Sequence, residues 1–346
     1  FKFMAMNFKE GRWNHEINVT DFVKTNITPY EGDASFLVGP TERTKAVWNK
    51  CLEALAEERA NNGVRSLDPS TVSTITSFAP GYIDKENEVI VGLQTDEVLR
   101  RAIKPFGGIK VVEKACRENG VEVDPKVKDI FTHYRKTHND GVFDAYTEEI
   151  RSFRSLGFLT GLPDNYARGR IIGDYRRLAL YGLDRLIEAK QNDLRHLTGP
   201  MTDARIRLRE EVAEQIKALK EIKIMGEQYG LELGRPAHNA QEAVQWVYMA
   251  YLAAVKEQDG AAMSLGNVSS FLDIYIEYDM AHGLLDEAHA QELIDQFVIK
   301  LRMVRHLRMQ AYTDIFAGDP TWVTESIGGR FNDGRTKVTK TSFRFL

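Results

Sequence analysis

The chain has 346 residues, of which 43% are hydrophobic and 28% charged, and its formal net charge is −4. This composition is typical of a globular protein, and its slight acidity does not favour a nucleic-acid or membrane-surface partner. No apolar run reaches membrane-spanning length, and no charged segment followed by an apolar one opens the chain as a secretion signal would. We therefore expect a cytoplasmic protein with enough residues for one large core.

Cysteine use points to the same compartment. Cys51 and Cys116 are the only cysteines in the sequence, and so few thiols in a long chain favour a reducing environment. Each is predicted to be a buried, small hydrophobic side chain. A disulfide between them is the less favoured alternative.

The first third of the chain reads as an arm followed by helices. Aromatic residues at irregular spacing up to residue 50 predict an arm packed over a core, and Asp21 is predicted to cap a short helix. Apolar spacing predicts helices over residues 41–61, 89–102 and 110–119. The Ser-, Thr- and Pro-rich stretch over residues 64–81 is predicted to be a loop.

Capping residues mark the later helices. Pro125 occupies the first position of a predicted helix that runs to Tyr134. A long charged helix is predicted over residues 203–229, and Asn239 and Asp286 are placed to cap the two helices that follow. Residues 341–346 are predicted to begin a strand. Short apolar segments that alternate with helices favour an α/β architecture.

The stretch from residue 157 to residue 182 concentrates arginine. The arginines in it or beside it are Arg154, Arg168, Arg170, Arg176 and Arg177. The guanidinium group is a planar, permanently charged fork that suits a carboxylate or phosphate ligand. An apolar pair, Phe158 and Leu159, predicts a strand before the loop, and apolar periodicity after the loop predicts a helix. The alternative is a solvated basic loop in which Asp174 and Asp184 form ion pairs with these arginines.

Several catalytic motifs are absent from the sequence. It contains no Cys-x-x-Cys and no His-x-x-x-His, and His133 and His138 are five positions apart, which places them on different faces of a helix. A zinc or catalytic metal site is therefore not expected. The glycine-rich dinucleotide and phosphate loops and the Gly-x-Ser-x-Gly motif are also missing. From the residues alone, we predict an anion-binding arginine loop and no nucleophile.

From about Trp13 to Leu346 the sequence resembles pyruvate formate-lyase, a family of glycyl-radical enzymes. Long blocks in the same order carry this resemblance. The most specific are ITPYEGDASFL, TVSTITSFAPGYI, VGLQTDEVLRRAIKPFGGIK, YRKTHNDGVFDAYTEEIR, GLPDNYARGRIIGDYRR, NAQEAVQWVYMAYLAAVKEQDGAAMSLG and AGDPTWVTESIGG. So many matching blocks make a chance likeness negligible.

The resemblance implies an α/β fold, the ten-stranded α/β barrel of glycyl-radical enzymes, built from two antiparallel five-stranded halves. This helix-rich chain would be the N-terminal portion of one such domain. Residues 1–60 would form a peripheral arm and helix, and residues 61–346 further helices and the first half-barrel. The chain begins with Phe1, and the family's adjacent cysteine pair and C-terminal radical glycine are not among its residues. We expect it to be part of a longer enzyme.

The resemblance also implies site residues. Arg170 matches the arginine that holds the pyruvate carboxylate, with Arg168 as its competitor. The apolar walls around the substrate match Ala261, Ala262, Phe316 and Trp322. The positions that contact the coenzyme A nucleotide match Phe143, Arg154 and Tyr166. An arginine fork facing small and aromatic walls suits a short 2-oxo acid, and an aromatic pair with an arginine suits adenine and phosphate.

The reaction implied is a radical one. Pyruvate and coenzyme A would become acetyl-coenzyme A and formate in anaerobic glucose fermentation, with coenzyme A as co-substrate and no tightly bound cofactor. The glycyl radical and the cysteine nucleophile would lie outside this chain, which is expected to be inactive in isolation. The resemblance further implies a homodimer and a radical-SAM activating enzyme that acts on the complete protein.

Two alternatives stay open at this point. A relative that acts on 2-oxobutyrate would keep Arg170, because the carboxylate is unchanged and one methylene alters pocket affinity by only about 1–3 kcal/mol. A non-catalytic half-barrel, serving as a partner or structural subunit, would also fit the sequence. The position of the true stop codon separates the enzyme from the stand-alone half.

Overall fold

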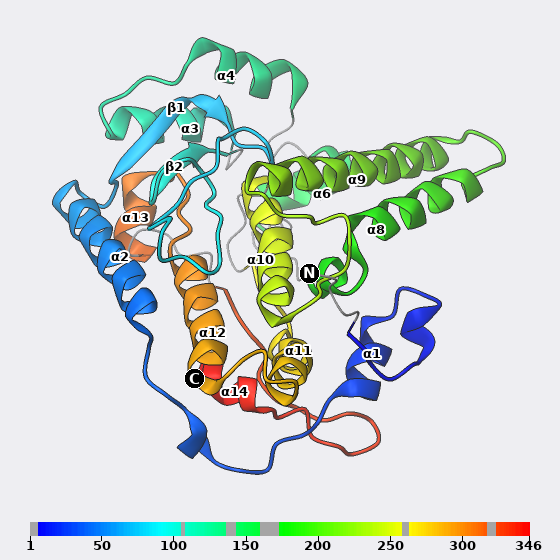
Figure 1. Ribbon diagram of the computed structural model, residues 1–346. Helices are drawn as coiled ribbons and strands as arrows, with labels where there is room; N and C mark the ends of the chain where they lie inside the picture. Colours follow the sequence, from blue (N-terminus) through cyan, green and yellow to red (C-terminus); the bar gives the residue numbers. More distant parts are fainter. Residues whose placement is uncertain (1–5, 105–107, 136–142, 160–172, 258–262, 317–322) are drawn as a thin grey trace.

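The computed structural model describes residues 6–104, 108–135, 143–159, 173–257, 263–316 and 323–346, without the side chains at 315 and 316. Its helices pack around one central helix, with a small sheet at one side (Figure 1). The α-helices are α1 (Val19–Asn26), α2 (Glu42–Ala60), α3 (Ile109–Glu118), α4 (Pro125–Asp129), α6 (Glu148–Ser155), α8 (Arg176–His196), α9 (Asp203–Gln228), α10 (Ala240–Glu257), α11 (Ser269–Ala281), α12 (Glu287–Arg302), α13 (Gln310–Phe316) and α14 (Lys340–Phe345). The short helical turns are η1 (Arg12–Asn14), η2 (Ala34–Phe36) and η3 (Ile130–Tyr134).

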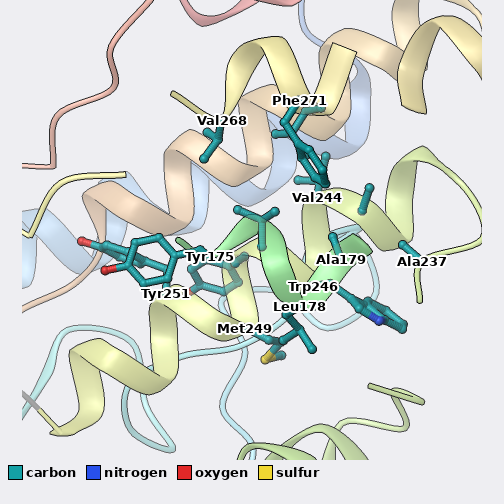
Figure 2. Close-up of a cluster of buried hydrophobic side chains, with 14 of the residues drawn as sticks. Tyr175, Leu178, Ala179, Ala237, Val244, Trp246, Met249, Tyr251, Val268 and Phe271 are labelled. Atoms are coloured by element: carbon teal, nitrogen blue, oxygen red, sulfur yellow. The ribbon is translucent and has the colours of Figure 1, made fainter. Parts of the chain in front are cut away.

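Helix α10 is the centre of the core. It is apolar on nearly every face, as its sequence predicts, and most of its side chains are buried. Trp246, Met249 and Tyr251 leave it in different directions and each meets a neighbouring element (Figure 2). Helices α8, α11 and α12 surround it, so the apolar side chains of four helices share one core.

The N-terminal segment packs on this core as the predicted arm. The ring of Phe8 lies 5.1 Å from that of Tyr275 on α11, and the ring of Phe22 on α1 lies 5.6 Å from that of Phe271. The cap of α1 differs from the prediction, because the side chain of Asn18 accepts the hydrogen bond from the amide of Asp21. Asp21 instead accepts a bond from the amide of Trp13 and holds η1 against α1.

Among the described residues the only sheet has two parallel strands, β1 (Ser66–Val72) and β2 (Arg100–Ile103). The sequence prediction of a loop over 64–81 is therefore wrong for β1. Pro69 lies where the register between the strands is irregular, from Leu67 to Val72. Proline is tolerated in a strand at such an irregularity, so its presence misled the prediction.

The predicted helix over residues 89–102 is also wrong, since β2 is the only regular element there. Side chains of the surrounding helices accept hydrogen bonds from the amides of this segment, in place of the backbone carbonyls that a helix would provide. The amide of Val89 donates to Gln296 Oε1 on α12 at 2.7 Å, and that of Val91 donates to Gln245 Oε1 on α10 at 2.7 Å. Two buried glutamines thus satisfy an extended segment whose apolar spacing imitates a helix.

The end of the chain is helical and not the predicted strand. Thr339 and Ser342 form a capping box, each side chain accepting from the other's backbone amide, and this starts α14. The predicted strand at Phe158 and Leu159 is wrong as well, because both residues lie in a bend that follows the turn at the end of α6.

The other helix predictions are confirmed. Helices α2, α3, α4, α8 and α9 lie where apolar spacing places them, and Pro125 occupies the first turn of α4. Asn239 accepts from the amide of Glu242, and Asp286 caps α12. Cys51 and Cys116 are free and buried, and burial raises the pKa of their thiols to about 12 and about 11.

Helix α8 contains one break that fixes its path. Gly182 has φ +70°, and a Cβ there would meet the carbonyl carbon of Arg235 at 2.5 Å. Only glycine therefore lets the chain near Arg235 approach this closely. The close approach allows the amide of Leu183 to donate a hydrogen bond to Leu233 O at 2.8 Å. Beyond this break α8 runs beside α9, and the two project from the body as a pair (Figure 1).

Candidate functional site

Most residues that the resemblance assigns to substrate lie outside the described residues. These are Arg170, Ala261, Ala262 and Trp322, together with the coenzyme A residue Tyr166 and the competitor Arg168. Phe316 ends α13, and its side chain is outside the description. Phe143 and Arg154 are described. The described segments that flank the assigned residues show which parts of the chain come together at the site.

Two of these flanks are joined by backbone hydrogen bonds. The amide of Leu265 donates to Thr324 O at 2.9 Å, and the amide of Ser326 donates to Gly266 O at 2.6 Å. Gly266 and Glu325 form a parallel bridge between the two bonds. The chain that continues from Ala262 and the chain that continues from Trp322 thus run side by side, 60 residues apart in sequence. We call residues 263–269 and 323–328 the junction.

Glu325 ties the junction to helix α11. Its Oε1 accepts hydrogen bonds from the amides of Val268 and Ser269, both at 2.8 Å. These amides lie at the start of α11, where the helix has no carbonyl to accept from them and no capping side chain of its own. Burial raises the pKa of Glu325 to about 7, and the amide bonds and the nearby Arg176 oppose that rise. The carboxyl group is therefore a cap that titrates near neutral pH.

The flank that follows Arg170 reaches the same place. Arg176, at the start of α8, binds Asp174 Oδ1 through Nε at 2.8 Å and donates through Nη1 to Asn267 O in the junction at 3.3 Å. Arg177 also pairs with Asp174, at 3.5 Å. The ion-pair alternative is thus confirmed for Asp174. Asp184 pairs with Lys223 on α9 at 2.7 Å and with none of the arginines of this stretch that are described.

Tyr175 adds a second contact beside that arginine. Its buried ring meets the ring of Tyr251 on α10 edge-on, with centroids 5.4 Å apart (Figure 2). The hydroxyl of Tyr251 donates to Met263 O, at the start of the junction, at 3.3 Å. The three flanks that continue to Arg170, Ala262 and Trp322 therefore meet at the junction and the C-terminal half of α10.

Phe143 and Arg154, the two described residues of the expected coenzyme A contact, lie beside each other. The guanidinium carbon of Arg154, on α6, lies 4.9 Å from the centroid of the Phe143 ring. Arg151 donates to Phe143 O at 2.6 Å and holds this segment to the same helix. Both members of the pair are partly exposed, so a planar ligand group can reach them.

Sequence reasoning missed a cluster of cations at the C-terminal end of α10. The ammonium group of Lys104 donates to Val255 O. Arg135 binds Glu257 Oε2 at 3.0 Å and Ser73 O at 3.2 Å. Lys256 is 2% exposed, and burial lowers its pKa to about 8. These charges complement the helix dipole, and a lysine within an otherwise apolar helix was the signal that could have found them.

Solved structures define the class of fold. The glycerol-bound B12-independent glycerol dehydratase from Clostridium butyricum matches 89% of this chain and 45% of its own, with TM-score 0.63 and 18% identity. A glycyl radical enzyme from Archaeoglobus fulgidus matches 93% of this chain and 45% of its own, with TM-score 0.53 and 15% identity. At such low identity these structures show the fold alone. The fold is that of the N-terminal part of glycyl-radical enzymes, as the resemblance implied.

A family model described as pyruvate formate lyase-like matches residues 9–346, so the chain belongs to that family. The formate acetyltransferase of Haemophilus influenzae is 56% identical over 344 residues, which are 98% of this chain and 45% of that protein. The chain spans under half the length of this relative. No helix in the described ranges is long and apolar enough to cross a membrane.

Proposed function

We propose that this chain is the substrate-binding, N-terminal part of a formate acetyltransferase that converts pyruvate and coenzyme A to acetyl-coenzyme A and formate. The observation that carries the proposal is the 56% identity to a formate acetyltransferase across 98% of the chain. Identity at this level over so much of the chain favours a shared reaction. The lower likenesses to dehydratases bear on the fold only.

Arg170 is the proposed clamp for the substrate carboxylate. The structure supports this choice by elimination among the neighbouring arginines. Arg176 and Arg177 are held by Asp174, and Arg154, beside Phe143, is the arginine proposed below for the coenzyme A nucleotide. Arg168 and Arg170 remain, and the family motif assigns the carboxylate to Arg170. A planar fork binds a carboxylate through two parallel hydrogen bonds and fixes its orientation as well as its charge.

Ala261, Ala262, Phe316 and Trp322 are the proposed apolar wall around the methyl and carbonyl groups of the substrate. Support comes from the junction, where the chain leaving Ala262 and the chain leaving Trp322 are bonded to each other. Small residues leave room for the substrate, and aromatic residues exclude water from it. Their role is to hold a two-carbon acyl group in a dry, fixed orientation.

Phe143 and Arg154, with Tyr166, are the proposed contact for the coenzyme A nucleotide. Support comes from the 4.9 Å separation of the Phe143 ring and the Arg154 guanidinium. A ring and a guanidinium in this arrangement offer a stacking face for adenine and a charge for phosphate. The acetyl acceptor would therefore approach from α6.

The rest of the complete protein supplies the radical glycine and the cysteine pair on which carbon–carbon cleavage depends. We propose that residues 1–60 serve as a peripheral arm and helix and residues 61–346 as the first half-barrel with its helices. The complete protein would act as a cytoplasmic homodimer in anaerobic glucose fermentation, after activation by a radical-SAM enzyme. The isolated chain would be inactive.

Product analysis of the complete protein tests this function. The protein should be activated without oxygen, its radical counted by electron paramagnetic resonance, and its turnover of pyruvate followed with and without coenzyme A. We expect formate and acetyl-coenzyme A in equal amounts. A protein that carries the radical but releases no formate from pyruvate would contradict the proposal. Faster turnover of 2-oxobutyrate than of pyruvate would favour that alternative substrate.

A further inference from the structure

A polar cleft of about 1090 Å³ is lined by described residues other than those proposed to bind substrate. It is enclosed by the C-terminal ends of α2, α3 and α12, the start of β1, and α13, which adjoin one another in Figure 1. All the residues that line it are described. Neither the junction nor the Phe143–Arg154 pair contributes to it. Its size suits a small metabolite.

The inner wall of the cleft is a closed ion-pair network. Glu58 is buried, and its Oε1 accepts from Arg101 Nη2 at 3.1 Å and from Arg305 Nε at 3.0 Å. Two guanidinium groups thus share one carboxylate, so the wall keeps an excess of positive charge. Glu58 also attracts Arg302 nearer the opening, but its single charge is then shared among three guanidinium groups.

Two arginines nearer the opening have no such partner. In the described part of the chain, no carboxylate pairs with Arg59 or Arg302. Arg65, in the same cleft, pairs with both Glu57 and Glu97. Burial lowers the pKa of Arg302, and repulsion from Arg305 and Arg59 lowers it further, against the attraction of Glu58. Two like charges that repel each other beside a polar cavity favour an anion between them.

The other two acids of the cleft are bonded to Gln310, another residue of its lining, and not to Arg59 or Arg302. Glu118 Oε2 accepts from the amide of Gln310, and Asp314 Oδ1 accepts from the side chain of Gln310, both at 2.8 Å. Asn61 and Asn62 add side-chain amides that form no hydrogen bond with the described residues, and both are exposed where α2 ends. The cleft therefore offers guanidinium groups for an anion and amides for hydroxyl groups.

We propose that this cleft binds a small phosphate monoester, with its phosphate between Arg59 and Arg302 and its hydroxylated part against Asn61 and Asn62. Guanidinium forks match phosphate oxygens, and charge-assisted bonds of this kind are the strong ones. The polar lining disfavours a membrane or an apolar peptide as occupant. No residue proposed to bind substrate or coenzyme A is among the residues that line this cleft, so the proposal stands or falls independently of theirs.

Arginine-specific modification of the complete protein tests the proposal, with phenylglyoxal as reagent and peptide mass spectrometry as readout. In the ligand-free protein we expect both Arg59 and Arg302 to react. Glycerol 3-phosphate should slow both reactions at least about fivefold, and glycerol should not. Arg205, on α9 and outside the cleft, should react at the same rate throughout.

Direct binding by calorimetry completes the test. Replacing both arginines (Arg59→Gln with Arg302→Gln) should weaken binding of glycerol 3-phosphate at least about tenfold, and Arg205→Gln should leave it unchanged. Unreactive Arg59 and Arg302 in the free protein would show that the cleft is covered and would overturn the site. Reaction without protection would also overturn it. Equal protection by inorganic phosphate would overturn the assignment of Asn61 and Asn62.

Discussion

The core around α10 and the junction beside it are built on different principles. In the core, side chains such as Trp246 and Tyr248 are buried among the apolar groups of four helices, and their polar atoms bond to nearby carbonyls. In the junction, the segment 263–269 buries Met263, Leu265 and Val268 in that same core, whereas backbone bonds and the carboxylate of Glu325 hold the segment 323–328 to it. The core is fixed by area removed from water, and the link between the two junction segments by a few directed polar contacts.

This difference separates stability from placement. Loss of an apolar group in the core should cost folding free energy, because it leaves a cavity in a closely packed interior. It should leave substrate binding unchanged, because the remaining core contacts keep the helices in place. A change in the polar contacts that link the two junction segments should mainly alter the placement of the segments that continue to Ala262 and Trp322. Each prediction below concerns the complete protein and tests one side of this division.

The largest effect on stability is expected for Trp246→Ala. Trp246 is 2% exposed, and its indole nitrogen donates to Arg235 O at 3.0 Å. Its removal should lower the free energy of unfolding by about 3–5 kcal/mol. Urea denaturation measures this, with Trp48→Ala as control because Trp48 is 37% exposed on α2. Similar losses for both variants would contradict the proposed role of the α10 core.

Trp322→Ala should lower turnover and change stability little, which is the opposite of Trp246→Ala. As part of the proposed apolar wall, Trp322 should contribute mainly to turnover, and its loss should lower kcat/KM for pyruvate by about 10- to 100-fold. The midpoint of urea denaturation should change little. Activity per folded molecule, measured on the same preparation, decides the matter. Full activity in the folded fraction, together with a loss of about 3–5 kcal/mol of stability, would make Trp322 a core residue.

Glu325→Gln should change how stability depends on pH. The folded-state pKa of about 7 lies above the ordinary value of 4.5, so the native state disfavours the charged form. The resulting penalty is absent below the ordinary pKa and grows as pH rises toward 7. Wild-type stability relative to Glu325→Gln should therefore fall by up to about 3 kcal/mol between pH 5 and pH 8.

Urea denaturation of both proteins at several pH values measures this difference, and groups common to both cancel. A difference that stays constant with pH would show that the amides of Val268 and Ser269 keep the pKa of Glu325 near its ordinary value. A difference that grows in favour of the wild type as pH rises would show that they lower it. Either result would remove the titrating cap from the account of the junction.

The smallest effect is expected for Phe143→Ala. Its ring contributes one stacking face beside Arg154, and an exposed cation–π contact is worth about 0.5–1 kcal/mol. The KM for coenzyme A should rise about two- to fivefold, with the KM for pyruvate unchanged. Steady-state kinetics with each substrate varied in turn measures this. Phe153→Ala is the control, because Phe153 is also an exposed aromatic residue near this segment. An equal rise in both variants would contradict a specific contact.

Helices and their caps were predictable because their signals are local. Apolar spacing placed α2, α9 and α10, and single residues such as Asn239 and Asp286 marked the starts of α10 and α12. The failures depended on distant partners. Gln245 and Gln296 bind the backbone near Val89 and Val91, and no feature of that segment itself indicates them. Tertiary contacts decided its conformation against its apolar spacing.

For the site, the residues alone predicted an anion-binding arginine loop but did not decide which arginine binds. Asp174 was foreseen as a structural partner, and the structure assigns Arg176 and Arg177 to it. Glu325 was not foreseen, because a glutamate in Trp-Val-Thr-Glu-Ser shows no sign that it caps a helix that begins 56 residues earlier. Such long-range polar contacts have no sequence period that would reveal them.

The central claim is that this chain supplies the carboxylate clamp of a formate acetyltransferase, and the most direct measurement compares Arg170→Lys with Arg168→Lys in the activated, complete protein. Lysine keeps the charge and loses the two-pronged fork. Arg170→Lys should lower kcat/KM for pyruvate by about 100-fold or more, in line with the about 2–5 kcal/mol carried by a buried charge pair. Arg168→Lys should retain most activity. Wild-type behaviour of Arg170→Lys together with inactivity of Arg168→Lys would contradict the account.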